Sequence, residues 1–201
     1  MTSPEAKSPR LQAGFAQAAI AVAALADVYR AMAVRDHVVH PTDASLKESG
    51  FASMVFVYVM AVAAVFFLVW LGRCRRNAQI LTGATVGASG VWAVVAWFIP
   101  VLNWWFPRQF VLDIERASAD VSQKASKAAL VNGWWAVWVA HLVVGAVALT
   151  AGQATAIPFI VAAATLTLGA AVLAICVIEH LTRLQGAVLR AAAPVEPLAH
   201  T

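Results

Sequence analysis

Residues 49–72 read SGFASMVFVYVMAVAAVFFLVWLG and contain no charged side chain. A helix needs about 20 predominantly apolar residues to cross the hydrocarbon core of a bilayer, and this stretch provides them without interruption. Backbone N–H and C=O groups find no water to bond in lipid, so a spanning segment of this kind is helical. The stretch therefore predicts a transmembrane helix.

The composition extends this conclusion to the whole chain of 201 residues, of which 62% are apolar and 12% are charged. Soluble domains carry about 25% charged residues and fewer apolar ones, so a soluble globular domain is excluded, and so is a disordered chain. A net charge of +4 does not by itself indicate a nucleic-acid binder. The lipid bilayer is the predicted partner, and no nucleic acid is expected.

The uncharged window 11–26 predicts a second crossing near the N-terminus. It extends to Val34 if Asp27 and Arg30, one helical turn apart, pair with each other. The window also resembles a secretory signal peptide, because basic residues precede it and a small-x-small pattern, residues 24–26, ends it. Its core is mostly alanine with two glutamines, which favours an uncleaved helix and leaves cleavage as the alternative.

The longest uncharged window, residues 128–178, is too long for one crossing. Gly152, Gln153 and Pro158 are turn signals inside it, so the window predicts a helical hairpin. With the two segments above, the chain has four predicted crossings.

A further apolar segment, residues 91–106, is short for a crossing and has Pro100 at its middle. Proline removes a backbone hydrogen bond, which is costly where lipid surrounds the helix. The segment therefore predicts a re-entrant or interfacial helix, with a full crossing as the alternative.

The positions of the basic residues favour the re-entrant interpretation. If the segment around Pro100 returns to the side it came from, eleven of the fourteen Lys and Arg residues share one side, against nine to five if it crosses. Cytoplasmic loops are enriched in Lys and Arg. We therefore predict an all-α integral membrane protein with four transmembrane helices plus one Pro-broken re-entrant or interfacial helix, and five transmembrane helices as the alternative.

The same count predicts a cell membrane protein with both termini in the cytoplasm. Residues 1–10 are then a cytoplasmic N-terminal tail and residues 11–180 a single helical membrane domain. Residues 181–201 follow as a cytoplasmic amphipathic tail, because apolar residues continue at helical spacing.

The Trp-rich stretch around Pro100 is the predicted ligand site. A proline break exposes carbonyl groups, Asn103 is a suitable partner for them, and broken helices line cavities in transporters. The predicted ligand-binding residues are Trp97, Pro100, Asn103, Trp104 and Arg108. The alternative is that the tryptophans form an interfacial belt and the prolines only end a helix.

Several motifs in the central part of the chain are specific in combination. They are R-x-R-x-N from Arg73, W-x-x-x-x-W-F-I-P-x-x-N from Trp92, P-R-Q from Pro107, D-I-x-R-A-S from Asp113 and N-x-W-W from Asn132. Over residues 51–183 the chain resembles the actinobacterial membrane family catalogued as domain of unknown function 4328. It departs from the usual family pattern at Val95, Ala96 and Glu115. The resemblance implies a polytopic membrane protein and brings no established activity with it.

His141 lies near the middle of the first helix of the predicted hairpin. A buried ionisable residue in a membrane is costly, which makes it a candidate functional group. The expected role is that of a neutral ring hydrogen-bonded across helices. The other candidate acids or bases are Asp113, Glu115 and Glu179.

No nucleophile motif, nucleotide-binding glycine loop or zinc-protease motif is present in the sequence, so no cofactor is predicted. His37 and His40 have a spacing that suits a metal, but two ligands do not complete a site, and no metal is predicted.

Three classes of function follow. The favoured one is a non-enzymatic accessory or interaction subunit with a membrane protein partner, because no catalytic constellation is found. The first alternative is a binder or carrier of an amphiphilic small molecule or lipid. The second is an intramembrane enzyme, which would need two acid or base groups that face one cavity.

Overall fold

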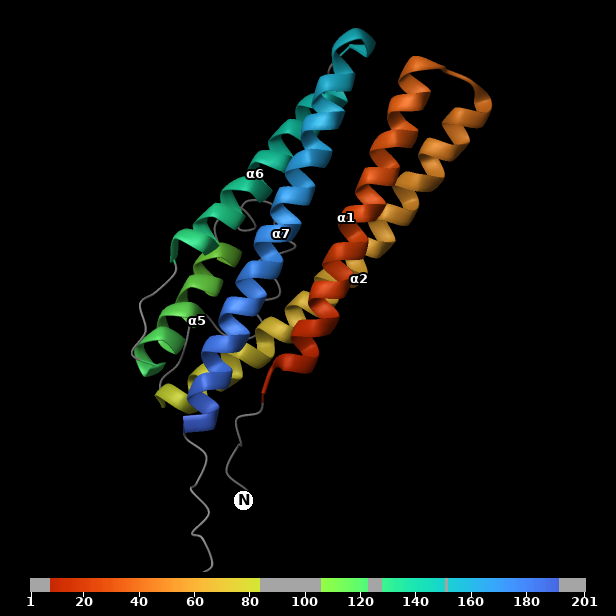
Figure 1. Ribbon diagram of the computed structural model, residues 1–201. Helices are drawn as coiled ribbons and strands as arrows, with labels where there is room; N and C mark the ends of the chain where they lie inside the picture. The colour runs from red at the N-terminus through yellow and green to blue at the C-terminus, as the bar shows by residue number, and fades with distance from the viewer. Residues whose placement is uncertain (1–7, 84–105, 123–127, 151, 192–201) are drawn as a thin grey trace, which may run out of the picture.

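The computed structural model describes residues 8–83, 106–122, 128–150 and 152–191, and every regular element in these ranges is a helix (Figure 1). The helices are α1 (Arg10–Val39), α2 (Asp43–Thr82), α5 (Phe106–Ser122), α6 (Ala128–Thr150) and α7 (Gln153–Ala191). All except α5 are long and apolar enough to cross a membrane. The prediction of an all-α membrane protein with four spanning helices and one further helix is confirmed. The predicted break at Pro100 lies outside the described residues.

The four long helices form two antiparallel hairpins, α1–α2 and α6–α7, which meet where α1 packs against α7 (Figure 1). α5 lies beside the end of the bundle at which α2 and α7 finish. The guanidinium of Arg75 on α2 lies 5.6 Å from the ring centre of Phe110 on α5. We call this end, which carries most of the arginines, the basic end, and the opposite end the turn end.

The turn between α1 and α2 is short because Thr42 caps α2. The hydroxyl of Thr42 accepts a hydrogen bond from the backbone N–H of Ser45, and the Ser45 hydroxyl accepts one from the backbone N–H of Thr42. This reciprocal capping box satisfies two donors at the start of the helix. His37 bonds Ser45 at 2.9 Å through Nδ1, which ties α1 to the cap of α2.

α2 extends well beyond its uncharged window. The helix continues through the charged residues 73–76 to Thr82 and ends at Gly83, whose φ of 66° is the left-handed conformation that favours glycine. Arginine and alanine are good helix formers, so charge alone does not end a helix at the membrane border. α2 therefore reaches out to contact α5.

The α6–α7 hairpin has a tighter turn than its sequence signals suggest. α6 ends at Thr150 and α7 begins at Gln153, so Pro158 lies inside α7. Proline removes one backbone hydrogen bond of the helix at this position, but α7 continues through it. α7 then continues to Ala191, and Leu181 and Leu184 in its last part are buried.

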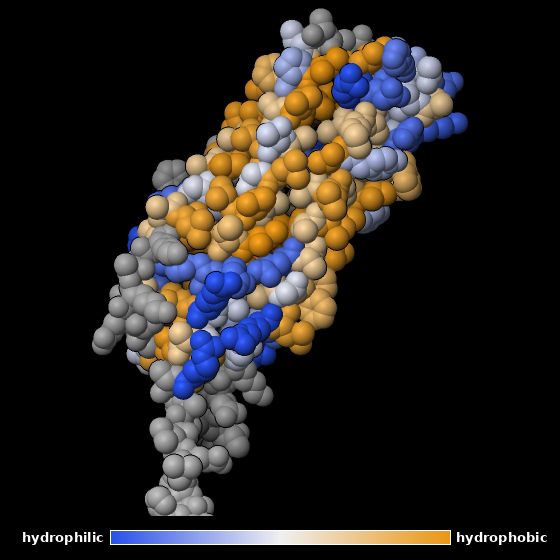
Figure 2. All heavy atoms as spheres, in the orientation of Figure 1, coloured by the Kyte–Doolittle hydropathy of each residue, from blue (hydrophilic) through white to orange (hydrophobic). Residues whose placement is uncertain are grey.

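Small side chains line the seam between the hairpins. The buried alanines include Ala16, Ala23 and Ala24 on α1 and Ala170 and Ala174 on α7. In lipid, helices associate through close packing more than through the hydrophobic effect, and small residues permit close approach. Figure 2 shows hydrophobic residues over the middle of one face and hydrophilic residues gathered toward both ends, as a membrane-spanning bundle requires.

Candidate functional site

A cavity of about 170 Å³ lies where the two hairpins meet, and it is not fully enclosed. All four long helices contribute to its lining, which includes Ile20, Phe67, Trp134, Trp138 and Ala170 and is almost wholly apolar. We call it the hairpin cavity. Its volume is close to the roughly 150 Å³ of an engineered apolar cavity that stays dry and binds benzene.

One wall of the hairpin cavity is aromatic and ends at a histidine. The rings of Phe67 and Trp134 lie 5.8 Å apart. Trp134, Trp138 and His141 follow one another at spacings of four and three residues, so they share one face of α6. The rings of Trp138 and His141 lie 5.7 Å apart. His141 therefore follows the aromatic wall on its turn-end side, beside Trp138, and is not itself a lining residue.

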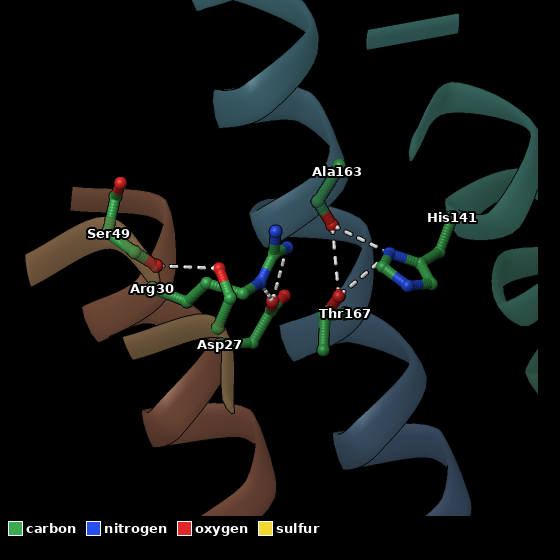
Figure 3. A network of polar contacts seen from close by, with 7 residues as sticks. Asp27, Arg30, Ser49, His141, Ala163 and Thr167 are labelled. Atoms are coloured by element: carbon green, nitrogen blue, oxygen red, sulfur yellow. Dashed lines mark hydrogen bonds and ion pairs between the residues drawn. The ribbon is translucent and has the colours of Figure 1, made fainter. Parts of the chain in front are cut away.

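The hydrogen bonds of His141 join α6 to α7 (Figure 3). Its Nδ1 lies 2.8 Å from Oγ1 of Thr167, which lines the hairpin cavity, and 3.2 Å from the carbonyl oxygen of Ala163. The carbonyl oxygen can only accept, whereas the Thr167 hydroxyl can accept from Nδ1 or donate to it, depending on which ring nitrogen carries the proton. The Thr167 hydroxyl donates its own proton to the same Ala163 oxygen at 3.1 Å.

The hydrogen bonds of the His141 ring all involve Nδ1. In a neutral imidazole with a proton on Nδ1, Nε2 is a hydrogen-bond acceptor. No partner for Nε2 of His141 occurs among the described residues.

A buried ion pair on α1 lies close to the same end of the cavity. Asp27 is fully buried, and its Oδ1 accepts hydrogen bonds from Arg30 at 2.6 and 2.7 Å. The pairing predicted from their spacing is thus present. The Arg30 guanidinium also lies 5.0 Å from the ring centre of Phe56 on α2, and Oδ2 of Asp27 has no hydrogen-bond partner in the described part of the chain.

The packing of α1 against α7 determines how far along the bundle the Asp27–Arg30 pair lies. Gln17 donates a hydrogen bond to Glu179 at 3.3 Å, which fixes the register of the two antiparallel helices. Asp27 lies ten residues after Gln17 on α1, and Gly169 lies ten residues before Glu179 on α7. Because the two helices are antiparallel, Asp27 is level with Gly169 and within one turn of Thr167. In Figure 3 the ion pair lies between α1 and the part of α7 that carries Thr167. Thr167 thus lines the turn-end side of the hairpin cavity, and Asp27 lies one turn beyond the lining residues Ala23 and Ala24 of α1.

A second buried polar cluster lies at the basic end, centred on Gln185. Its Nε2 donates to the carbonyl oxygen of Cys74 at 2.8 Å and to Oγ of Ser118 at 3.1 Å, while its Oε1 accepts from Asn77 at 3.2 Å. The residue is fully buried. It joins α2, α5 and α7, so its role is to hold α5 in place.

The structure brings Glu115 into this second cluster. Nε2 of His180 on α7 donates to Oε1 of the fully buried Glu115 at 3.3 Å. Asp113 is partly exposed and bonds Gln109 at 2.9 Å. Arg108 donates to Asn132 at 2.9 Å, which links α5 to the start of α6. These sequence-predicted residues hold the basic end together and do not line the hairpin cavity.

Glu179 lies one turn from the cavity, but its carboxylate is bonded by Arg183 and is 43% exposed, so it points out of the bundle. Of the four candidate acids or bases, only His141 is next to the cavity. Among the described residues there is no group of three His, Cys, Asp or Glu side chains that could hold a metal ion.

The predicted ligand-binding residues Trp97, Pro100, Asn103 and Trp104 lie outside the described residues. The cavity instead uses residues that the sequence interpretation did not select as a site, above all Trp138 and Thr167. The spacing of Trp134, Trp138 and His141 was a usable signal, because it places two aromatic rings and a polar ring on one helix face.

Comparison with known proteins relates the chain to a protein family. A family model described as Domain of unknown function (DUF4328) matches residues 35–183. The match includes His141 and Thr167 and leaves out Asp27. No curated protein and no solved structure matches the chain significantly.

Proposed function

This chain belongs to the DUF4328 family, whose activity is unknown, and we propose that it is a non-enzymatic membrane protein that binds an amphiphilic small molecule or lipid in the hairpin cavity. The observation that carries the proposal is the cavity itself, which combines an almost wholly apolar lining with the polar side chain of Thr167. Small-molecule sites have this combination, because apolar walls bind the chain and a few polar groups fix its orientation.

The location of the cavity determines the kind of molecule that fills it. A void of about 170 Å³ costs the dispersion contacts of the atoms that line it. Its apolar walls offer water few hydrogen bonds, so water does not compensate for the loss. Lipid surrounds the bundle, and an apolar chain is therefore the natural occupant.

The position of the charged residues supports the non-enzymatic character. Acid–base catalysis needs two groups within reach of one substrate. His141 stands at the cavity, while Glu115 and Asp113 are engaged at the basic end. The accessory role predicted from the sequence stays a prediction, because no contact of the described residues favours a particular protein partner.

The orientation of the bundle is part of the proposal. The basic end carries Arg10, Arg73, Arg75, Arg76, Arg108, Arg116, Arg183 and Arg190, whereas Arg35 and Lys47 flank the turn of the α1–α2 hairpin. By the positive-inside rule the basic end faces the cytoplasm of a cell membrane. The chain leaves α2 and enters α5 in the same half of the bundle, which supports a return of the intervening segment to its starting side.

Photo-crosslinking tests the binding proposal. The probe is dodecyl methyl ether with a diazirine at mid-chain, added to the purified protein in phospholipid nanodiscs. Ala170 lines the cavity and Ala162 lies on the exposed face of the same helix, so Ala170→Leu fills the cavity and Ala162→Leu is the matched control. We expect saturable labelling of the Trp134–Trp138 region, reduced about tenfold by Ala170→Leu, since overpacking costs roughly 1–3 kcal/mol.

The control variant must be labelled like the unmodified protein. Labelling that rises linearly with probe concentration, or that is the same in both leucine variants, would contradict binding in the cavity.

A further inference from the structure

A second apolar hollow lies between α1 and α2, on the outside of the bundle, since most of its lining residues are exposed. It is an open groove of about 410 Å³, and it shares no lining residue with the hairpin cavity. Its lining includes Phe15, Ala18, Val22, Val59, Val62 and Phe66. We call it the outer groove, and it is a separate site from the one proposed above.

The surroundings of the outer groove indicate what covers it. The rings of Phe15 and Phe66 stack with their centres 5.7 Å apart and form the end of the groove nearer the basic end. Exposed apolar side chains of a membrane-spanning bundle face lipid tails. An acyl chain of a bilayer lipid therefore fills the groove, and the residues beyond its end determine which head group that lipid carries.

Two arginines continue the groove face of α2 toward the basic end. Val62 and Phe66 are four residues apart, and exposed Val69 and then Arg73 and Arg76 follow at spacings of three, four and three. Residues with these spacings share one face of a helix. Arg73 lies seven residues after Phe66, which is about 10 Å along the helix axis. The groove face of α2 thus ends in two guanidinium groups.

The positive charge of these two arginines is not neutralised by the described side chains. Neither Arg73 nor Arg76 has a salt bridge or hydrogen-bond partner among the described residues. Three acidic side chains described at this end are bonded elsewhere, Glu179 to Arg183, Glu115 to His180 and Asp113 to Gln109. An anion beside the two arginines would therefore be favourable.

The distance between the groove and the arginines matches the length of one lipid leaflet. Tyr58, at the other end of the groove, lies fifteen residues before Arg73, which is about 22 Å along the helix axis. Half of a bilayer that includes its head groups is about 20–22 Å thick. With Arg73 at the level of the phosphates, the groove lies beside the acyl chains of the same leaflet.

We propose that the outer groove, Arg73 and Arg76 form a binding site for one anionic phospholipid. One acyl chain lies in the groove, and the phosphate accepts hydrogen bonds from the two guanidinium groups, which suit phosphate oxygens. A zwitterionic phospholipid brings its own ammonium group, which repels the arginines. A head group with a net negative charge, as in phosphatidylglycerol, complements them.

The test compares two photoreactive lipids that differ only in the head group. Phosphatidylglycerol and phosphatidylcholine, each with a diazirine at mid-chain, are added in trace amounts to the purified protein in phosphatidylcholine nanodiscs. We expect the phosphatidylglycerol probe to label residues 15–22 and 58–66, and unlabelled phosphatidylglycerol to displace it. The phosphatidylcholine probe should label them about 10- to 30-fold less, as two arginines near a lipid phosphate allow.

A pair of double variants separates the site from the general charge of the basic end. Arg73→Gln/Arg76→Gln should reduce labelling by the phosphatidylglycerol probe to the level of the phosphatidylcholine probe. The matched control Arg116→Gln/Arg190→Gln removes two exposed arginines from the same end and should keep the preference. Unchanged labelling by the phosphatidylcholine probe shows that the groove of the first variant is folded.

Three results would overturn the proposal. Equal labelling by both probes in the unmodified protein would do so without any variant. An equal loss of preference in the two double variants would assign it to the overall charge of the basic end. Displacement of the probe by inorganic phosphate, but not by chloride at the same ionic strength, would show that the arginines bind a free anion and not a lipid.

Discussion

Nδ1 of His141 and Oγ1 of Thr167 lie 2.8 Å apart and join α6 to α7 at the edge of an apolar cavity. The bond fixes the orientation of the imidazole through Nδ1. Burial of a polar group in lipid is costly unless it is hydrogen-bonded, and this bond reduces that cost for both side chains.

The bond itself should add little to stability. His141→Gln keeps an amide that can donate to Thr167 or Ala163, and transmembrane hydrogen bonds are worth about 0.6 kcal/mol on average. We expect the free energy of unfolding, measured in mixed detergent micelles, to fall by less than about 1 kcal/mol. A loss of about 3 kcal/mol or more would show that the ring has structural partners beyond these two residues.

Loss of the arginine from the ion pair on α1 should lower the stability of the protein. Asp27 is fully buried, so Arg30→Leu leaves a carboxylate without compensation, which costs about 3–5 kcal/mol in buried pairs. In the double variant Asp27→Leu/Arg30→Leu no uncompensated charge is left, and most of the stability should return. Equal unfolding free energies for the single and the double variant would mean that Asp27 is not charged, or that water reaches it.

Among the polar residues of the basic end, Gln185 should make one of the largest contributions to stability. Gln185→Leu removes three hydrogen bonds that connect α2, α5 and α7. Because Asn77 and Ser118 are also buried, we expect a loss of about 2–3 kcal/mol in unfolding free energy. The matched control is Gln109→Leu on the exposed face of α5, which should change stability by no more than about 0.5 kcal/mol. Similar effects of both substitutions would contradict the role of Gln185.

Cysteine labelling tests the orientation of the bundle without altering its charges. In a background with Cys74→Ala and Cys176→Ala, single cysteines replace Gln79 and Gln109 at the basic end and Ala44 at the turn end. An impermeant thiol reagent should label Ala44→Cys in intact cells, and the other two only after the cells are opened. Labelling of Gln109→Cys from outside would rule out the proposed return of the chain before α5.

The spanning helices could be predicted from the sequence because the positions of charged residues are visible directly. The ends of the helices were harder to place. The uncharged window ends at Gly72, whereas α2 continues to Thr82, and Asn77 in this extension is buried against Gln185. These two residues are more than 100 positions apart in the chain, so no local pattern indicates their contact.

The same limit applies to the candidate site. His141 was identified from its position in an uncharged segment, and Asp27 and Arg30 from their spacing. The cavity depends on which faces of the two hairpins meet, and Thr167 is an ordinary threonine in an apolar run until α7 packs against α6. Tertiary packing therefore determines the site, while the sequence alone indicates which residues are costly to bury.

Native mass spectrometry of the protein extracted from its own membrane tests the central claim most directly. If the hairpin cavity binds an amphiphile in the cell, the unmodified protein and the control Ala162→Leu carry one small non-covalent adduct per chain, and Ala170→Leu carries none. An adduct of the same mass and occupancy on Ala170→Leu, or no adduct on any of the three proteins, would contradict the claim.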